Sequence, residues 1–130
     1  MSELGTPTEL LYTEDHEWVR KDGKYAYIGI TDFAQDSLGD IVYVEVDLEI
    51  DDEAEKDFIF GTIEAVKTVS DLIMPISGKI VEINKEMESE PETITSSTYT
   101  DGWIIKVEIL DEADFDLLLD NESYKALTTE

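Results

Sequence analysis

The sequence contains no cysteine and a single histidine, His16, in 130 residues. The absence of cysteine excludes disulfides, thiolate metal sites and thiol nucleophiles, and it is compatible with a reducing compartment. One imidazole provides neither a base–nucleophile pair nor a nitrogen-rich set of metal ligands, so we assign His16 no chemistry. Calcium-loop patterns and glycine-rich phosphate loops are also missing. We therefore expect no metal site, no catalytic residue and a chain that is bound or modified rather than an enzyme.

Positive charge and long apolar runs are scarce as well. Nine Lys and Arg residues stand against 33 Asp and Glu residues, which gives a formal net charge of −24 and a sequence pI near 4.1. Such a surface repels nucleic acid and anionic membranes. No apolar run approaches the ~20 residues of a membrane-spanning helix, and the start of the chain has no signal- or transit-peptide pattern. We expect a cytoplasmic monomer without nucleic-acid or membrane partners.

The apolar pattern that is present predicts a mainly β chain, typical of a sandwich or barrel. Short β-prone runs bounded by turn signals occupy residues 25–30, 41–46, 58–65, 69–75, 78–83 and 102–110. A capping-box-like start predicts a short helix near residues 32–38, and the polar residues 84–101 indicate a long loop. Helical spacing of apolar residues predicts a C-terminal helix at about residues 112–127.

An internal correspondence suggests how the strands are arranged. Gly39 and Gly78 each begin the pattern G-x-I-V-x-(V/I). Coincidence is an alternative, because the pattern is short. A flattened two-sheet barrel with pseudo-twofold symmetry, however, needs glycine at equivalent corners. In such a fold the turn within residues 64–68 would carry Lys67 at its tip, where a hairpin usually has Asn-Gly or Asp-Gly.

Four segments, in the same order and at similar separations, resemble the glycine cleavage system H protein family. They are HEWVR at 16–20, IGITDFAQDSLGDIVYVEV at 28–46, EAVKTVSDLIMPISGKIVEIN at 64–84 and DGWIIKV at 101–107. The resemblance implies a single H protein-like lipoyl-carrier domain over residues 1–130, with its core in residues 10–110. The implied fold is the lipoyl/biotinyl-type barrel-sandwich hybrid. Biotin carriers place their lysine between methionines, whereas Val66 and Thr68 flank Lys67, so lipoate is favoured over biotin.

The resemblance also implies a task. In H proteins the lysine amine is joined to lipoate, which takes an aminomethyl group from a pyridoxal-phosphate glycine decarboxylase. The group is then presented to a folate-dependent aminomethyltransferase. A flavin-containing (FAD) dihydrolipoamide dehydrogenase reoxidises the arm, and a lipoate-attaching enzyme installs it. The chain would therefore be a covalent cofactor carrier in glycine catabolism rather than a catalyst.

The resemblance assigns roles to five residues. Lys67 matches the lipoyl-attachment lysine, and Glu64 and Gly78 match positions that lipoate-attaching enzymes read. Glu64 could also be an ordinary strand carboxylate, and Gly78 a structural corner. Glu17 and Asp71 match the cleft into which the loaded arm folds, where carboxylates hold the protonated amine; the alternative is that both are plain surface carboxylates.

Several positions depart from the family pattern. Thr95 and Thr98 replace an asparagine and a proline, residue 65 is alanine where serine is common, and residues 47–57 lack a proline and glycine turn. These departures leave two other functions open. One is an H-like lipoyl carrier that acts in lipoate relay or with another redox partner, and the other is an unmodified acidic binding module.

Overall fold

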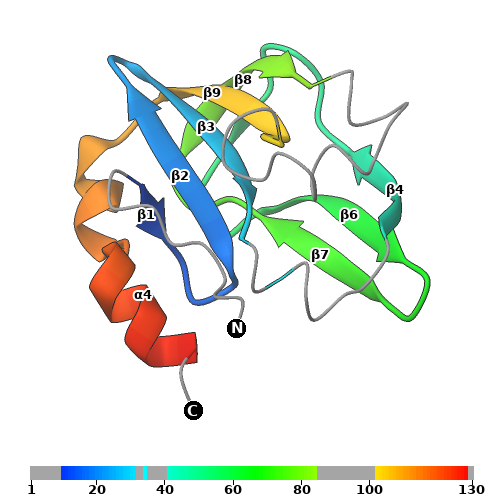
Figure 1. Ribbon diagram of the computed structural model, residues 1–130. Coiled ribbons are helices and arrows are strands. Elements are labelled where there is room, and N and C mark those ends of the chain that lie inside the picture. Colours follow the sequence, from blue (N-terminus) through cyan, green and yellow to red (C-terminus); the bar gives the residue numbers. More distant parts are fainter. Residues whose placement is uncertain (1–9, 32–33, 35–40, 85–101, 129–130) are drawn as a thin grey trace.

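A computed structural model describes residues 10–31, 34, 41–84 and 102–128 of the chain (Figure 1). Two antiparallel β-sheets and a C-terminal helix make up these ranges, which confirms the mainly β barrel-sandwich fold. The short helix expected near residues 32–38 and most of the loop expected at residues 84–101 lie outside the described residues. Within the described ranges, neither helix has the length and apolar character that a membrane span requires.

The larger sheet has six strands in the order β1-β2-β3-β9-β8-β5, and the smaller has three in the order β4-β6-β7. The first set comprises β1 Leu11–Tyr12, β2 Glu17–Asp22, β3 Tyr25–Ile30, β9 Ile105–Ile109, β8 Gly78–Ile83 and β5 Glu53–Ala54. The second comprises β4 Ile41–Val46, β6 Ile59–Ala65 and β7 Val69–Ile73. Each of the six β-prone runs of the sequence contains one of these strands, whereas β1, β2 and β5 were not among the predictions.

The β2–β3 hairpin turns through two residues, because Asp22 pairs with Tyr25. Gly23, the first of the two, has φ +63°, a conformation that glycine adopts without the cost that a β-carbon imposes. The tight turn fixes the register of β2 on β3. That register places Glu17 opposite Ile30 at the far end of the pair.

The main core lies between the two sheets. Its buried side chains are almost all aliphatic and come from both sheets: Val19, Ala26, Ile28, Ile30, Val44, Ala54, Phe60, Ile63, Ala65, Leu72, Met74, Ile76, Ile80, Ile104, Ile105 and Val107. Alternate residues of β3 and β9 face this core, as expected for strands with one buried face. Burial of this apolar surface is the main force that holds the sheets together.

A second, aromatic cluster lies on the opposite face of the large sheet. It consists of Leu10, Tyr12, Trp18 and Tyr124. The rings of Tyr12 and Tyr124 are stacked with their centroids 4.8 Å apart. Tyr124 comes from the C-terminal helix α4, Asn121–Thr128, so this cluster attaches the helix to the sheet beside β1 (Figure 1).

The C-terminal segment, expected as one helix at about residues 112–127, consists of two short helices. The 3-10 helix η1, Glu112–Leu117, begins at Asp111, whose side chain accepts a hydrogen bond from the Ala113 amide. Residue Leu119 then pairs with Tyr12 through backbone hydrogen bonds of 2.7 and 2.8 Å. This added bridge to β1 requires extended backbone and interrupts the helix before α4 begins.

Candidate functional site

Lys67 lies in the turn between β6 and β7, as predicted. The last strand pair is Glu64 with Val69, and the Ala65 amide donates to the Thr68 carbonyl at 2.8 Å. Val66 and Lys67 are therefore the two residues at the tip, and both are exposed. Among the described residues, Lys67 has no hydrogen bond or ion pair, so its amine extends from an ordered turn into solvent.

The backbone of this turn explains why it does not need Asn-Gly. The described non-glycine residues with positive φ are His16, Asp51 and Asp57. Val66 and Lys67 are not among them, so the tip does not use the left-handed geometry of the turns that favour Asn-Gly. A β-branched residue and a lysine therefore fit without backbone strain.

Glu64 and Asp71 share the outer face of the small sheet. Glu64 pairs with Val69 and Thr62 pairs with Asp71, and residues two apart on a strand point to the same side. Both carboxylates are exposed. Glu64, Lys67 and Asp71 therefore all belong to the β6–β7 hairpin, with Lys67 at its tip.

Glu17 reaches the hairpin from the other sheet. It is the first residue of β2, its side chain is 2% exposed, and its Oε2 accepts a hydrogen bond from the Ile73 amide of β7 at 2.7 Å. Its other oxygen, Oε1, is buried without a hydrogen-bond partner among the described residues. Glu17 is thus a buried residue that links the two sheets, and not a surface carboxylate. Its partner Ile73 lies two residues after Asp71 on β7.

The environment of Glu17 favours a neutral carboxyl group. Its pKa is raised well above the ordinary value, chiefly because burial disfavours the charged form. The hydrogen bond from Ile73 opposes this shift, and the nearby carboxylates of Asp15 and Asp57 add to it. Nothing in the sequence distinguishes Asp15 or Asp57 from the many other acidic residues. Their positions in turns close to Glu17 become visible only in the fold.

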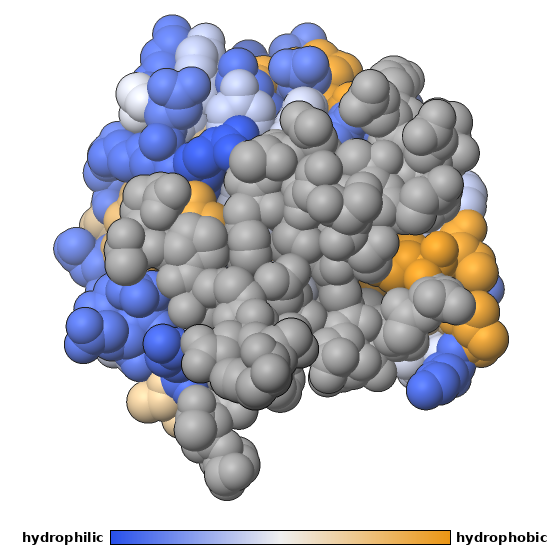
Figure 2. All heavy atoms as spheres, in the orientation of Figure 1, coloured by the Kyte–Doolittle hydropathy of each residue, from blue (hydrophilic) through white to orange (hydrophobic). Residues whose placement is uncertain are grey.

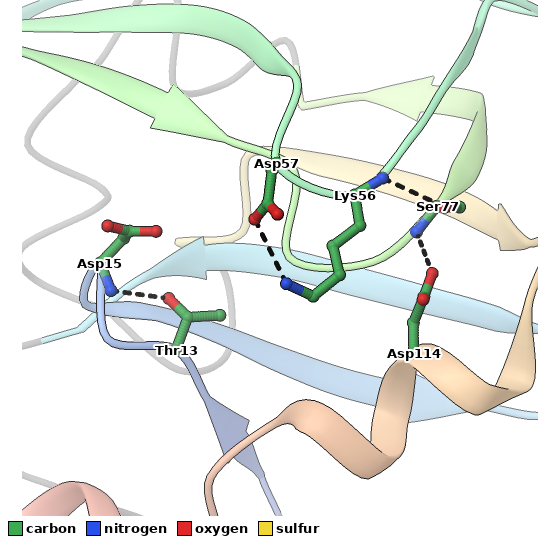
Figure 3. A network of polar contacts seen from close by, with 6 residues as sticks. All are labelled: Thr13, Asp15, Lys56, Asp57, Ser77 and Asp114. Atoms are coloured by element: carbon green, nitrogen blue, oxygen red, sulfur yellow. Dashed lines mark hydrogen bonds and ion pairs between the residues drawn. The ribbon is translucent and has the colours of Figure 1, made fainter.

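A cavity of about 220 Å³ lies beside these turns. Its walls come from four segments far apart in the sequence: Thr13, Glu14 and Asp15; Lys56 and Asp57; Met74 and Pro75; Leu117, Leu118 and Leu119. Among the lining residues, Lys56 Nζ donates to Asp57 Oδ1 at 3.2 Å, and the Asp15 amide donates to Thr13 Oγ1 at 3.2 Å; Figure 3 shows both contacts. No group of three or more possible ligands in the described ranges could hold a metal ion.

Hydrogen bonds attach the wall of this cavity to η1. The Ser77 amide donates to Asp114 Oδ2 at 2.8 Å, and the Lys56 amide donates to Ser77 Oγ at 3.1 Å (Figure 3). The C-terminal segment therefore supports the cavity as well as the aromatic cluster.

Gly78 is separate from the hairpin. It is buried at the start of β8 in the large sheet, where it pairs with Ile109 of β9 and Ala54 of β5. A β-carbon at this position would lie 2.7 Å from Val107 Cγ2. This close approach explains the glycine by packing, in agreement with the structural-corner interpretation.

His16 lies in a buried polar network next to Glu17. Its Nδ1 is 2.9 Å from the Tyr124 hydroxyl, which is also 2.7 Å from Thr31 Oγ1. Burial lowers the pKa of the His16 ring, and Asp15 partly offsets the effect. No role of Tyr124 or Thr31 in this network could be predicted from the sequence, because Tyr124 lies 93 and 108 positions along the chain from its two partners and such contacts leave no local signal.

Exposed apolar side chains surround the lysine turn. Val42 and Tyr43 of β4, with Val66 and Val69 of the hairpin, are each between 48% and 71% exposed. Figure 2 shows hydrophobic surface at the end of the molecule where β4 and the hairpin lie. On a chain with a net charge of −24, such a patch is typical of a contact surface.

Two comparisons with known proteins agree with this geometry. A family model described as "Glycine cleavage H-protein" matches residues 10–130. A crystal structure of a glycine cleavage system H protein from Mycobacterium marinum superposes with a TM-score of 0.83 and 35% sequence identity, over 92% of this chain and 96% of that chain. This chain belongs to the glycine cleavage H-protein family.

Proposed function

We propose that this protein is the lipoyl carrier of a glycine cleavage system, with lipoate attached to Lys67. The observation that carries the proposal is the exposed Lys67 amine at the tip of an ordered hairpin, in a chain that belongs to the H-protein family. A rigid turn suits a modifying enzyme, because its backbone is already ordered before the enzyme binds.

The residues around Lys67 fit an attached lipoyl group. The lysine amine is exposed and, in the described part of the chain, has no ion pair that lipoylation would break. Apolar Val66 and Val69 lie beside it, as suits a long hydrocarbon arm. The exposed Glu64 lies on the same hairpin, where a lipoate-attaching enzyme could contact both residues at once.

Attached to Lys67, lipoate would supply a dithiolane ring that opens, so that one sulfur can carry the aminomethyl group from glycine decarboxylase to aminomethyltransferase while the other is left as a thiol. The chain itself makes and breaks no bond. Asp71 of β7 and Glu17 of β2, whose carboxyl contacts the Ile73 amide, would supply carboxyl oxygens to the amine of a loaded arm. The tether keeps the carried group at a high effective concentration near successive enzymes, and a flavin-containing dihydrolipoamide dehydrogenase regenerates the arm.

Attachment is tested by incubating the purified unmodified chain with lipoate, ATP and a lipoate-attaching enzyme. We expect one lipoyl adduct by intact mass, and none on Lys67→Arg, which keeps the charge but removes the acylatable amine. Lys79→Arg is the matched control, because Lys79 is only partly exposed on β8, and it should be modified like the wild type. A lipoyl adduct on Lys67→Arg would contradict the assignment.

The shuttle function is tested by adding glycine decarboxylase and labelled bicarbonate to the lipoylated chain. A carrier of the glycine cleavage system should support exchange of the label into glycine. A chain that is lipoylated but supports no exchange would instead belong to lipoate relay or serve another redox partner. A chain that is not lipoylated at all would be a binding module.

A further inference from the structure

We propose that Tyr124 of the C-terminal helix is a positioning residue for Glu17: its hydroxyl clamps the end of the β2–β3 pair and so holds the Glu17 carboxyl against β7. The inference rests on the proposed function for the part that concerns the loaded arm. Its structural part, that α4 controls the environment of Glu17, stands independently of lipoylation.

The clamp is the hydroxyl of Tyr124, which contacts one residue just before β2 and one just after β3. Tyr124 is 1% exposed, and its hydroxyl lies 2.9 Å from His16 Nδ1 and 2.7 Å from Thr31 Oγ1. His16 and Thr31 face each other directly beyond the last β2–β3 pair, and the Thr31 amide donates to the His16 carbonyl at 3.0 Å. Tyr124 therefore ties together the two segments that flank the β2–β3 pair at the point where the ladder ends.

The backbone at this point needs support. His16 has φ +69°, a left-handed conformation that is costly for a residue with a β-carbon and persists where its surroundings hold it. The His16 amide donates to the Thr13 carbonyl at 3.1 Å, and the Thr13 amide donates to the Glu17 carbonyl at 3.0 Å. The side-chain contact with Tyr124 is the long-range part of this support.

Glu17 is the next residue, and it points to the other face of the sheet. Trp18 belongs to the aromatic cluster with Tyr124, whereas Val19 belongs to the core between the sheets, so Glu17 and Val19 share the inner face. From there the Glu17 carboxyl reaches the Ile73 amide of β7. Helix α4 thus supports the start of β2 on the outer face of the large sheet, while the Glu17 carboxyl contacts β7 on the inner face. If the His16 backbone relaxed, both the start of β2 and the Glu17 carboxyl would be free to move.

The first test uses the unmodified chain and the variant Tyr124→Phe, which keeps the ring stacked on Tyr12 but removes the hydroxyl. The readout is a carbon-13 NMR titration of the Glu17 carboxyl, assigned by its absence in Glu17→Gln. We expect the titration midpoint in Tyr124→Phe to fall toward that of an ordinary glutamate by about 0.5 pH unit or more, because water gains access to the carboxyl.

Two further variants make this result specific. Tyr25→Phe removes a hydroxyl from the opposite end of β3 and should leave the Glu17 titration unchanged. Thr31→Val removes the second partner of the Tyr124 hydroxyl and should shift the midpoint in the same direction as Tyr124→Phe. An unchanged Glu17 midpoint in folded Tyr124→Phe, or an equal shift in Tyr25→Phe, would overturn the proposal.

The second test uses the lipoylated, aminomethyl-loaded carrier and measures the formaldehyde formed when water hydrolyses the aminomethyl group, with ammonia and the free dithiol arm as the other products. We expect Glu17→Gln to speed release about 5-fold and Tyr124→Phe about 3-fold; independent effects would multiply to about 15-fold, whereas a shared path leaves the double variant near 5-fold. Combined with Asp71→Asn, which lies on the other sheet, the Tyr124→Phe effect should multiply. Lipoylation of Lys67 should proceed at the wild-type rate in every variant.

The outcomes separate the two proposals. Normal lipoylation with a multiplicative Tyr124→Phe and Glu17→Gln pair would overturn the positioning role and leave the carrier function intact. An absence of lipoylation on Lys67 together with a shifted Glu17 titration would overturn the carrier function and support the clamp.

Discussion

At Glu17 the chain buries a carboxyl group and satisfies only one of its oxygens within the described residues. Burial of a charged group without full hydrogen bonding is costly, and a carboxyl reduces that cost by keeping its proton. The neighbouring carboxylates of Asp15 and Asp57 act in the same direction. In the proposed carrier function, the ammonium of a loaded arm close to this carboxyl would favour its charged form instead.

This environment predicts how stability depends on pH. The pKa of Glu17 is higher in the folded protein than in the unfolded chain, where it lies near 4.5. The stability that the protonated carboxyl contributes is therefore fully present below the unfolded pKa and is lost as pH rises through the folded pKa. Glu17→Gln keeps an acceptor for Ile73 but does not ionise. We expect the free energy of unfolding of the variant to gain on that of the wild type as pH rises above about 4.5, by up to ~1.4 kcal/mol per pH unit until the pH passes the folded pKa.

Urea unfolding of both proteins at several pH values measures this difference, because ionisations common to both cancel. Glu64→Gln is the matched control for the substitution itself, since it makes the same chemical change at an exposed position of the hairpin. If the advantage of Glu17→Gln over the wild type in free energy of unfolding stays constant or shrinks with rising pH, the pKa of Glu17 is not raised.

At the scale of elements, the hairpin that carries Lys67 and the strands around it could be predicted because their signals are local. The run IVYVEV and the paired runs on either side of Lys67 are short, rich in β-branched and aromatic residues, and bounded by turn residues. The strand β2 was missed because its sequence EWVRKD mixes charged and apolar residues, and its pairing with β3 supplies the stability that propensity does not. Two-residue β1 and β5 carry no period at all.

The C-terminal segment shows the opposite error, an element predicted too long. Its apolar spacing suits a continuous helix, but Leu119 gains two backbone hydrogen bonds with Tyr12 by adopting extended structure. Such long-range contacts compete with local helix propensity and cannot be read from a short window. The same limit applies to the candidate site. Lys67 and its turn follow from local sequence, whereas the Tyr124 clamp joins residues from distant parts of the chain.

The junction of β8 and β9 yields a prediction about Gly78. In Gly78→Ala the new β-carbon would lie 2.7 Å from Val107 Cγ2 and 3.3 Å from the Glu108 carbonyl oxygen. Both neighbours belong to a paired strand, and Val107 is buried, so neither can move freely. We expect a loss of about 1–3 kcal/mol in the free energy of unfolding, measured by urea unfolding. Val107→Ala should make the methyl group added by Gly78→Ala less costly, so the two changes together should destabilise less than the sum of their separate effects.

The Gly78→Ala variant also tests whether a lipoate-attaching enzyme recognises Gly78. Because Gly78 is buried in the sheet that does not carry Lys67, the folded fraction of Gly78→Ala should be lipoylated at the wild-type rate. A stable, fully folded Gly78→Ala that is lipoylated slowly would show that the glycine is recognised rather than merely packed.

For the whole molecule, net charge is the dominant electrostatic feature. The chain carries 33 acidic and nine basic residues, and the ion pairs between described residues are Lys21–Glu112, Lys56–Asp57 and Lys79–Asp51. Exposed pairs of this kind contribute little. Most carboxylates therefore act on the fold through mutual repulsion, which opposes the compact state.

Salt should consequently stabilise the protein. The Debye length falls from ~30 Å at 0.01 M to ~3 Å at 1 M, so repulsion between carboxylates on different strands is screened early in this range. We expect the melting midpoint of the unmodified chain at neutral pH to rise markedly in NaCl, with most of the gain below ~0.3 M.

A triple variant, Glu45→Gln, Glu55→Gln and Glu108→Gln, should melt higher at 0.01 M and gain less from salt, because it has fewer charges to screen. Sodium sulfate at equal ionic strength should add a further rise through its exclusion from the protein surface, which separates screening from enhanced apolar burial. A wild-type midpoint that stays flat or falls in NaCl, or a triple variant with an unchanged salt response, would mean that the carboxylates are spaced well enough for net charge not to govern the stability of this fold.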